Sequence, residues 1–340
     1  MKEHYNSLDG IRAYAAIGIV LLHVLRNSAI QPHENYITGV LIPFFNSFVF
    51  LFMIISGFSL CCGYYDRFKN GMITPNMFYM KRYSRILPFF AILCIIDFCT
   101  SPGIGTLLET FADLTLCFGL MPTSVDIHVI GVGWFLGVVF LFYMLFPFFV
   151  FLLDNKRRAW LSLLISLGLC FSICIYFPVP QKHKSMIFCA PYFISGGLIF
   201  LYRSTICQLF LKNKFIVSVI IFATTLLYLS ISKSLTSDFI KNTALVILFS
   251  LWTSYALCAK GIVLNNHIAT YLSGISMEIY LAHMLVFRAV EKMHIETIIS
   301  QADLLYIFNS LLTLLGVVSF AHVMKRYVLP ALSKLASLAE

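Results

Sequence analysis

Ten apolar runs, each long enough to cross a lipid bilayer, constrain the fold of this chain more than any other feature. A membrane-spanning helix needs about 20 largely apolar residues. Runs of about this length lie near residues 8–27, 40–63, 83–99, 131–153, 159–178, 186–203, 214–232, 240–259, 267–290 and 304–326. No connecting loop is long enough to hold a soluble domain. The sequence therefore predicts one membrane-embedded domain, residues 1–340, folded as an all-α polytopic bundle.

The charged residues lie mostly in the loops, and their sign predicts the topology. The chain is 60% hydrophobic and 11% charged, which excludes a soluble fold. With ten spans and a cytoplasmic N-terminus, most of the 24 lysines and arginines fall in cytoplasmic loops, as the positive-inside rule requires. Residues 104–121, which include Glu109 and Asp113, could form an eleventh crossing. The lysines and arginines would then be divided almost equally between the two sides of the membrane. We therefore expect about ten spans, both termini in the cytoplasm, and a surface position for residues 104–121.

Charge and cysteine content also argue against a nucleic-acid partner, a disulfide framework and a zinc site. The net charge of +9 follows the membrane topology, so it indicates no nucleic-acid partner. The ten cysteines lie almost entirely within apolar runs, and none forms a C-x-x-C pair. They are typical of small buried residues rather than of a disulfide framework or a zinc site. We expect no metal site and no permanently bound cofactor.

Arg12 and His23 lie within the first apolar run. Arg12 and His23 are eleven positions apart, which turns a helix by about three full turns, so both side chains lie on one face about 16 Å apart along the axis. Ionisable groups inside a membrane usually face a bundle interior or a watered cavity, which favours a polar shaft and a candidate active site. The alternative is that Arg12 reaches the headgroups, paired with Asp9, while His23 is a neutral core histidine.

Two further motifs lie toward the predicted cytoplasmic side. Ser56 and Gly57 end the second run, where they would allow close helix packing or open backbone groups toward a ligand. Arg82 and Arg85 are three residues apart and share a helix face, a spacing that suits a multiply charged phosphate ligand. Basic residues at this position also satisfy the positive-inside rule without any ligand.

Polar and aromatic residues gather at the opposite side as well. Trp134 begins the fourth run beside a glycine-rich entry, where it would serve as an interfacial anchor or line a sugar or acyl pocket. The ninth run contains Glu278, Tyr280 and His283, with the last two on one face. Glu278 would either pair with a basic group across the bundle or mark a proton or cation route.

Five motifs together resemble the acyltransferase-3 family of integral-membrane acyltransferases. They occur in the same order over nearly the whole chain, although each alone is weak. They are LDGIRA…LLHV with Arg12 and His23, SGF at residues 56–58, RYSRILP at residues 82–88, WFL…FYMLFP at residues 134–147 and ISMEIYLAH ending at His283.

The resemblance implies transfer of an acyl group, usually acetyl, from acetyl-CoA as co-substrate to a hydroxyl of a bacterial cell-surface carbohydrate. Lipopolysaccharide O-antigen, capsule, exopolysaccharide, peptidoglycan or a lipid-linked precursor would be the acceptor, and the protein would be multi-pass in the bacterial inner membrane. The implied partners are acyl-CoA, the carbohydrate and the bilayer, with a homo-oligomer or polysaccharide-assembly proteins left open.

The resemblance also implies roles for individual residues. Arg12 and His23 would be the catalytic pair. The acyl donor would bind at Ser56, Arg82 and Arg85. The substrate pocket would include Trp134, Tyr280 and His283.

Two departures from the family pattern, and two rival functions, remain. Many members carry Glu-Glu-Gln where this chain has Val139, Phe140 and Leu141, and many carry a fused SGNH domain, so we expect a stand-alone core.

A transporter or flippase for a small anion or lipid-linked sugar would use the same polar residues, with Glu278 and His283 as coupling groups. A non-catalytic scaffold would leave the Arg12 and His23 pair unexplained.

Overall fold

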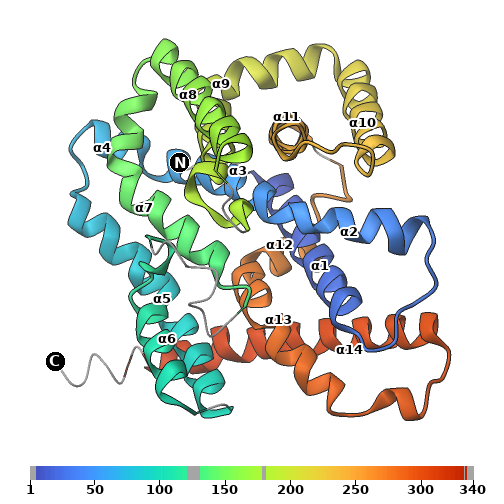
Figure 1. The fold of residues 1–340 in the computed structure, drawn as a ribbon. Coiled ribbons are helices and arrows are strands. Elements are labelled where there is room, and N and C mark those ends of the chain that lie inside the picture. Colours follow the sequence, from blue (N-terminus) through green and yellow to red (C-terminus); the bar gives the residue numbers. More distant parts are fainter. Residues whose placement is uncertain are drawn as a thin grey trace.

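The computed structural model describes residues 5–100, 102–120, 131–177, 181–259, 261–332 and 334, and this part of the chain is helical with no strand. Figure 1 shows α14 running across the lower part of the molecule, with α13, α12 and α1 above it. The longer helices are α1 (Asn6–Asn27), α3 (Phe48–Leu60), α5 (Pro75–Thr100), α7 (Trp134–Leu153), α8 (Lys156–Ile175), α9 (Met186–Lys212), α10 (Lys214–Ile231), α11 (Asp238–Cys258), α13 (Ser276–Glu291) and α14 (Ala302–Val323). The shorter ones are α2 (Ile42–Phe44), α4 (Asp66–Lys69), α6 (Ile104–Leu114) and α12 (His267–Gly274).

The expected polytopic helical bundle is confirmed, and the chain is a multi-pass membrane protein. Within the described ranges, nine continuous helical stretches are long and apolar enough to cross a membrane. One of them, Ile37–Lys69, joins α2, α3 and α4 through short 3₁₀ and π turns. Each of the nine corresponds to one of the apolar runs in the sequence.

The tenth apolar run, residues 267–290, is divided into two helices. Helix α12 ends at Gly274, Ile275 leaves the helical conformation, and α13 starts at Ser276. The carbonyl oxygen of Gly274 accepts a hydrogen bond from the Lys325 ammonium group, which satisfies a backbone group that the break exposes. Broken helices within a membrane are tolerated where they line a cavity, and this break does so.

Residues 104–121 contain one short helix. Helix α6 has 11 residues, which spans about 17 Å and is too short for a hydrocarbon core of about 30 Å. Its apolar side chains Ile104, Leu108 and Phe111 are exposed, whereas Asp113 is buried. This agrees with the expected surface position; Met121, at the end of the segment, lies outside the described residues.

Close helix packing places α1 at the centre of the bundle. It contacts α3, α11, α12, α13 and α14. Small buried residues allow this, because a Cβ atom on Gly10 would collide with the backbone of Leu264 and one on Gly18 with the ring of Phe48. Arg12 and His23 of α1 are therefore partly buried among the neighbouring helices.

A second close contact joins α3 to α9. A Cβ atom on Gly57 would meet the carbonyl oxygen of Phe193, and one on Gly196 would meet that of Ile54. The glycine of the SGF motif thus serves helix packing. The neighbouring Ser56 is free of this contact and lines a cavity instead.

Candidate functional site

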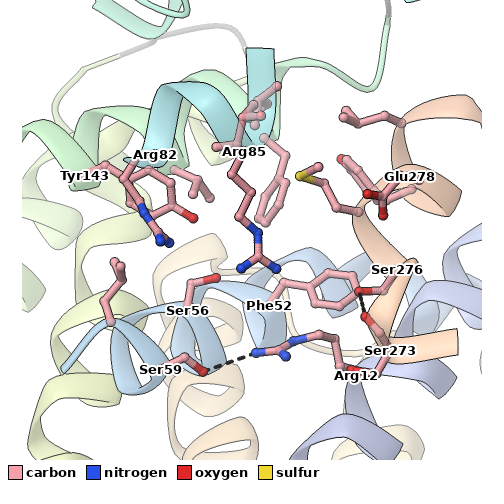
Figure 2. A pocket seen from close by; sticks show the side chains of 18 of the residues that line it. Arg12, Phe52, Ser56, Ser59, Arg82, Arg85, Tyr143, Ser273, Ser276 and Glu278 are labelled. Carbon is pink, nitrogen blue, oxygen red and sulfur yellow. Dashed lines mark hydrogen bonds between the residues drawn. The ribbon is translucent and has the colours of Figure 1, made fainter. Parts of the chain in front are cut away.

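Six of the residues selected from the sequence line one cavity, Glu278 and Tyr280 among them. It has a volume of about 350 Å³ and lies between α1, α3, α5, α7 and the α12–α13 junction. Arg12 comes from α1, Ser56 from α3, and Arg82 and Arg85 from α5 (Figure 2). We call this the inner cavity. Helices that are far apart in the sequence thus bring three guanidinium groups to the wall of one cavity.

Arg12 is held in place by polar contacts on two sides. Its Nη1 lies 3.4 Å from Asp9 Oδ1 and its Nη2 donates to Ser59 Oγ at 3.2 Å. Asp9 also accepts a hydrogen bond from Ser273 Oγ at 2.9 Å. The ion pair with Asp9 that the sequence suggested is present, and the guanidinium lines the inner cavity.

The two arginines of α5 differ in their contacts. Arg82 Nη2 donates to the Tyr64 hydroxyl at 2.7 Å, and its guanidinium lies over the Tyr64 ring at 5.0 Å. Arg85 forms no ion pair with a carboxylate in the part of the chain that the structure describes. Figure 2 shows its guanidinium pointing across the cavity toward Arg12 and Phe52. Arg85 is thus positioned to meet an anion that enters.

Glu278 is the carboxylate of this cavity wall. It is buried, with Oε1 3.7 Å from the Nζ of Lys325. The structure therefore pairs it with a basic group across the bundle, one of the two alternatives that the sequence left open. Because Lys325 offsets Glu278 and Asp9 faces Arg12, the arginines of α5 leave the cavity with an excess of positive charge.

A second, smaller cavity contains the histidine of α1. It has a volume of about 180 Å³ and is lined by His23, Arg26, Asn46, Trp134 and His183, among others. We call this the outer cavity. Its walls are the end of α1, the start of the second span, the start of α7 and the turn before α9. Trp134 thus belongs to a cavity wall, one of the two alternatives that the sequence left open.

The hydrogen bonds of His23 select one tautomer. Nδ1 donates to the carbonyl oxygen of Ile19 at 2.9 Å, so the lone pair of the neutral ring is on Nε2. The ring of His283 lies 4.8 Å from that of His23. A histidine fixed in this way can accept a proton at Nε2 from a group in the cavity.

His283 packs against the His23 ring and lines neither cavity. It is buried, and its Nδ1 donates to the carbonyl oxygen of Tyr280 at 2.6 Å. Its Nε2 has no hydrogen-bond partner among the residues that the structure describes. The expected place for His283 was the substrate pocket; the structure puts it in ring contact with the pocket histidine.

Tyr280 separates the two cavities and lines both of them. Its hydroxyl donates to the carbonyl oxygen of Val132 at 3.0 Å, and the rings of Phe52 and Phe135 pack against it at 6.3 and 5.2 Å. The prediction of a single polar shaft that contains both Arg12 and His23 is therefore wrong, because the two residues lie in separate cavities. An aromatic partition from α3, α7 and α13 separates them, which no spacing on α1 could indicate.

Some lining residues were missed by the sequence analysis. Arg26 is three residues after His23, so the helical period that paired Arg12 with His23 could have found it. Tyr143 lies inside the FYMLFP motif but carries no charge to draw attention. His183 lies in a three-residue 3₁₀ turn between two spans, which is too short for a periodic pattern to indicate which way it faces. Over the described ranges, no group of three histidine, cysteine or acidic side chains is arranged to hold a metal.

Comparisons with known proteins agree with these features. A family model described as an acyltransferase domain matches residues 5–323. The chain is also similar to "Protein 2 in picA locus" of Rhizobium radiobacter, with 32% identity over 90 residues. This match covers 26% of the chain and 42% of the relative, so it spans less than half of the relative's length. No solved structure matches the chain.

Proposed function

Because the chain belongs to the acyltransferase-3 family, we propose that it transfers an acetyl group from acetyl-CoA to a hydroxyl of a bacterial cell-surface polysaccharide or its lipid-linked precursor. It would do so in the bacterial inner membrane. The observation that carries this proposal is the pair of cavities that meet at Tyr280, one lined by three arginines and the other by a histidine and a tryptophan.

The inner cavity suits the acyl donor. Coenzyme A carries several phosphate charges, and guanidinium groups bind phosphate through paired, charge-assisted hydrogen bonds. Arg85 and Arg82 would hold these phosphates, and Arg12 would orient the arm that carries the thioester. Ser56 lines the same wall and offers a hydroxyl to that arm. This assignment places the thioester near Tyr280.

The outer cavity suits the acceptor and the chemical step. The acceptor hydroxyl would donate its proton to His23 Nε2 as its oxygen attacks the thioester carbonyl carbon. Collapse of the tetrahedral intermediate breaks the carbon–sulfur bond, and the coenzyme A thiolate takes the proton from His23. A covalent acyl-His23 intermediate is the variant of this mechanism, and ping-pong kinetics would identify it.

The charge distribution in the loops supports an orientation for this reaction. With both termini in the cytoplasm, the inner cavity would open toward the compartment that holds acetyl-CoA. The outer cavity, at the far end of α1, would open toward the compartment where surface glycans are assembled. The acyl group would then cross the partition at Tyr280.

Mass spectrometry of surface glycans tests this function. Cells that express the protein should gain one acetyl mass per repeat unit, and mild base should remove it. Cells that express His23→Ala should lack the modification while keeping the protein in the membrane. As a matched control, His267→Ala removes an exposed histidine outside both cavities and should acetylate normally.

A transport assay tests the rival function. Purified protein in liposomes should release free coenzyme A thiol over many turnovers only when an acceptor glycan is present. Solute movement across the liposome membrane without consumption of acetyl-CoA would contradict the proposal and favour a transporter.

A further inference from the structure

The outer cavity carries an excess of positive charge that transfer of an acyl group does not itself require. The Arg26 guanidinium lies in its wall, and His23 and His183 line it as well. No aspartate or glutamate is among its described lining residues. A carboxylate near His183, that of Asp238, is held by Lys182 in an ion pair of 2.8 Å. The cavity therefore favours an anion.

The basic groups are held in a prepared arrangement. Arg26 Nη1 donates to Asn46 Oδ1 at 3.1 Å, which fixes the guanidinium at the cavity wall. The turn that carries His183 is fastened by Lys182, which binds Asp238 and also the carbonyl oxygen of Cys174 at 3.4 Å. A ligand that binds here would meet groups already in place, which lowers the entropic cost of binding.

An aromatic wall completes the cavity. The Trp134 indole contributes to its lining and contacts the His183 ring edge-on, at 5.9 Å between centroids and 89° between planes. Aromatic rings offer an apolar face to the C–H groups of a sugar ring. An aromatic face beside fixed cationic groups is a suitable site for a charged saccharide.

We propose that the acceptor is an acidic saccharide whose carboxylate or phosphate binds Arg26 while a nearby hydroxyl lies at His23. This inference rests on the proposed function and specifies its acceptor. Arg26 and His23 are three residues apart on one helix face, so their Cβ atoms are about 5–6 Å apart. That separation allows one sugar unit to present its anion to Arg26 and its hydroxyl to His23.

Binding of matched saccharides to the full-length protein in nanodiscs tests this proposal. The probes are cellotetraose, tetraglucuronate and cellotetraose 6-phosphate, measured by calorimetry at physiological salt. At least one acidic probe should bind at least tenfold more tightly than cellotetraose, and comparing the two acidic probes tells whether carboxylate or phosphate is preferred. Arg26→Gln should abolish the preference. Arg157→Gln, which removes the same charge from an exposed site at the start of α8, should preserve it.

Three results would overturn the acidic-acceptor proposal. In the first, neither acidic probe binds measurably. In the second, the neutral and acidic probes bind equally well. In the third, Arg157→Gln loses the preference for the acidic probes to the same extent as Arg26→Gln. Failure of the proposed function is distinguishable from these. It would appear as absence of acetyl transfer by the wild-type protein although the charge preference and its dependence on Arg26 are intact.

Discussion

His23 and His283 show how a buried side chain can serve a site that it does not line. The His283 ring lies 4.8 Å from that of His23, and its own Nδ1 is fixed by the Tyr280 carbonyl oxygen. His23, the proposed base, is therefore packed on one side by a side chain that is itself anchored. A base within hydrogen-bond reach of its proton donor depends on this kind of support.

Replacing His283 should affect turnover and leave donor binding intact. His283→Ala removes the ring beside His23, so the base loses its fixed orientation, and we expect kcat to fall about 10- to 100-fold, the cost of misplacing a catalytic group by about 1 Å. Because His283 does not line the inner cavity, the KM for acetyl-CoA should be unchanged. Steady-state kinetics measures both values. A raised KM with normal kcat would contradict this role.

The outer cavity should bind an acidic saccharide more tightly at lower pH. Burial, together with the neighbouring Lys184 and Arg26, lowers the pKa of His183 below its ordinary value of 6.5, and Asp238 partly opposes this. His183 is therefore neutral at pH 7 and gains a positive charge only as the pH falls below 6.5. A carboxylate with a pKa of about 3.5 stays ionised there.

Titration of tetraglucuronate at pH 7 and pH 5 measures this effect. The wild-type affinity should rise at pH 5, and His183→Gln should reduce this rise. An identical pH response in His183→Gln and wild type would show that His183 does not face the ligand.

At the scale of elements, the sequence indicated most helices but not how they break or meet. Long apolar runs mark their own spans, because a bilayer requires about 20 apolar residues. The break at Ile275 has no comparable signal, since Gly274 and Ser276 within an apolar run are equally compatible with a continuous helix. Helical period placed Arg12 and His23 on one face, but the partition between them comes from other helices.

The contact between α3 and α9 should be sensitive to a single methyl group. Gly57→Ala places a Cβ atom against the Phe193 carbonyl oxygen, and such overpacking typically costs about 1–3 kcal/mol. Gly168→Ala is the matched control, because its Cβ atom meets nothing within 4 Å and alanine favours a helix. Thermal unfolding in detergent compares the two. Equal melting temperatures would mean that α3 and α9 are not closely packed.

At the scale of the whole molecule, the topology remains a prediction from charge. Nine continuous helical stretches and the divided α12–α13 segment together account for the ten apolar runs in the described ranges. A C-terminal green fluorescent protein fusion should therefore be fluorescent, because that reporter folds in the cytoplasm. An active C-terminal alkaline phosphatase fusion in place of a fluorescent one would contradict a cytoplasmic C-terminus.

The two-cavity account is tested most directly by measuring acetyl-CoA binding and acetyl transfer on the same purified variants. His23→Ala should bind acetyl-CoA like the wild type while transfer falls about 10²- to 10⁴-fold, the usual contribution of a general base. Arg85→Gln should instead weaken acetyl-CoA binding about tenfold or more, the loss expected for a charge-assisted hydrogen bond. Normal transfer by His23→Ala, or unchanged acetyl-CoA binding by Arg85→Gln, would contradict a donor cavity at the arginines and a reaction centre at the histidine.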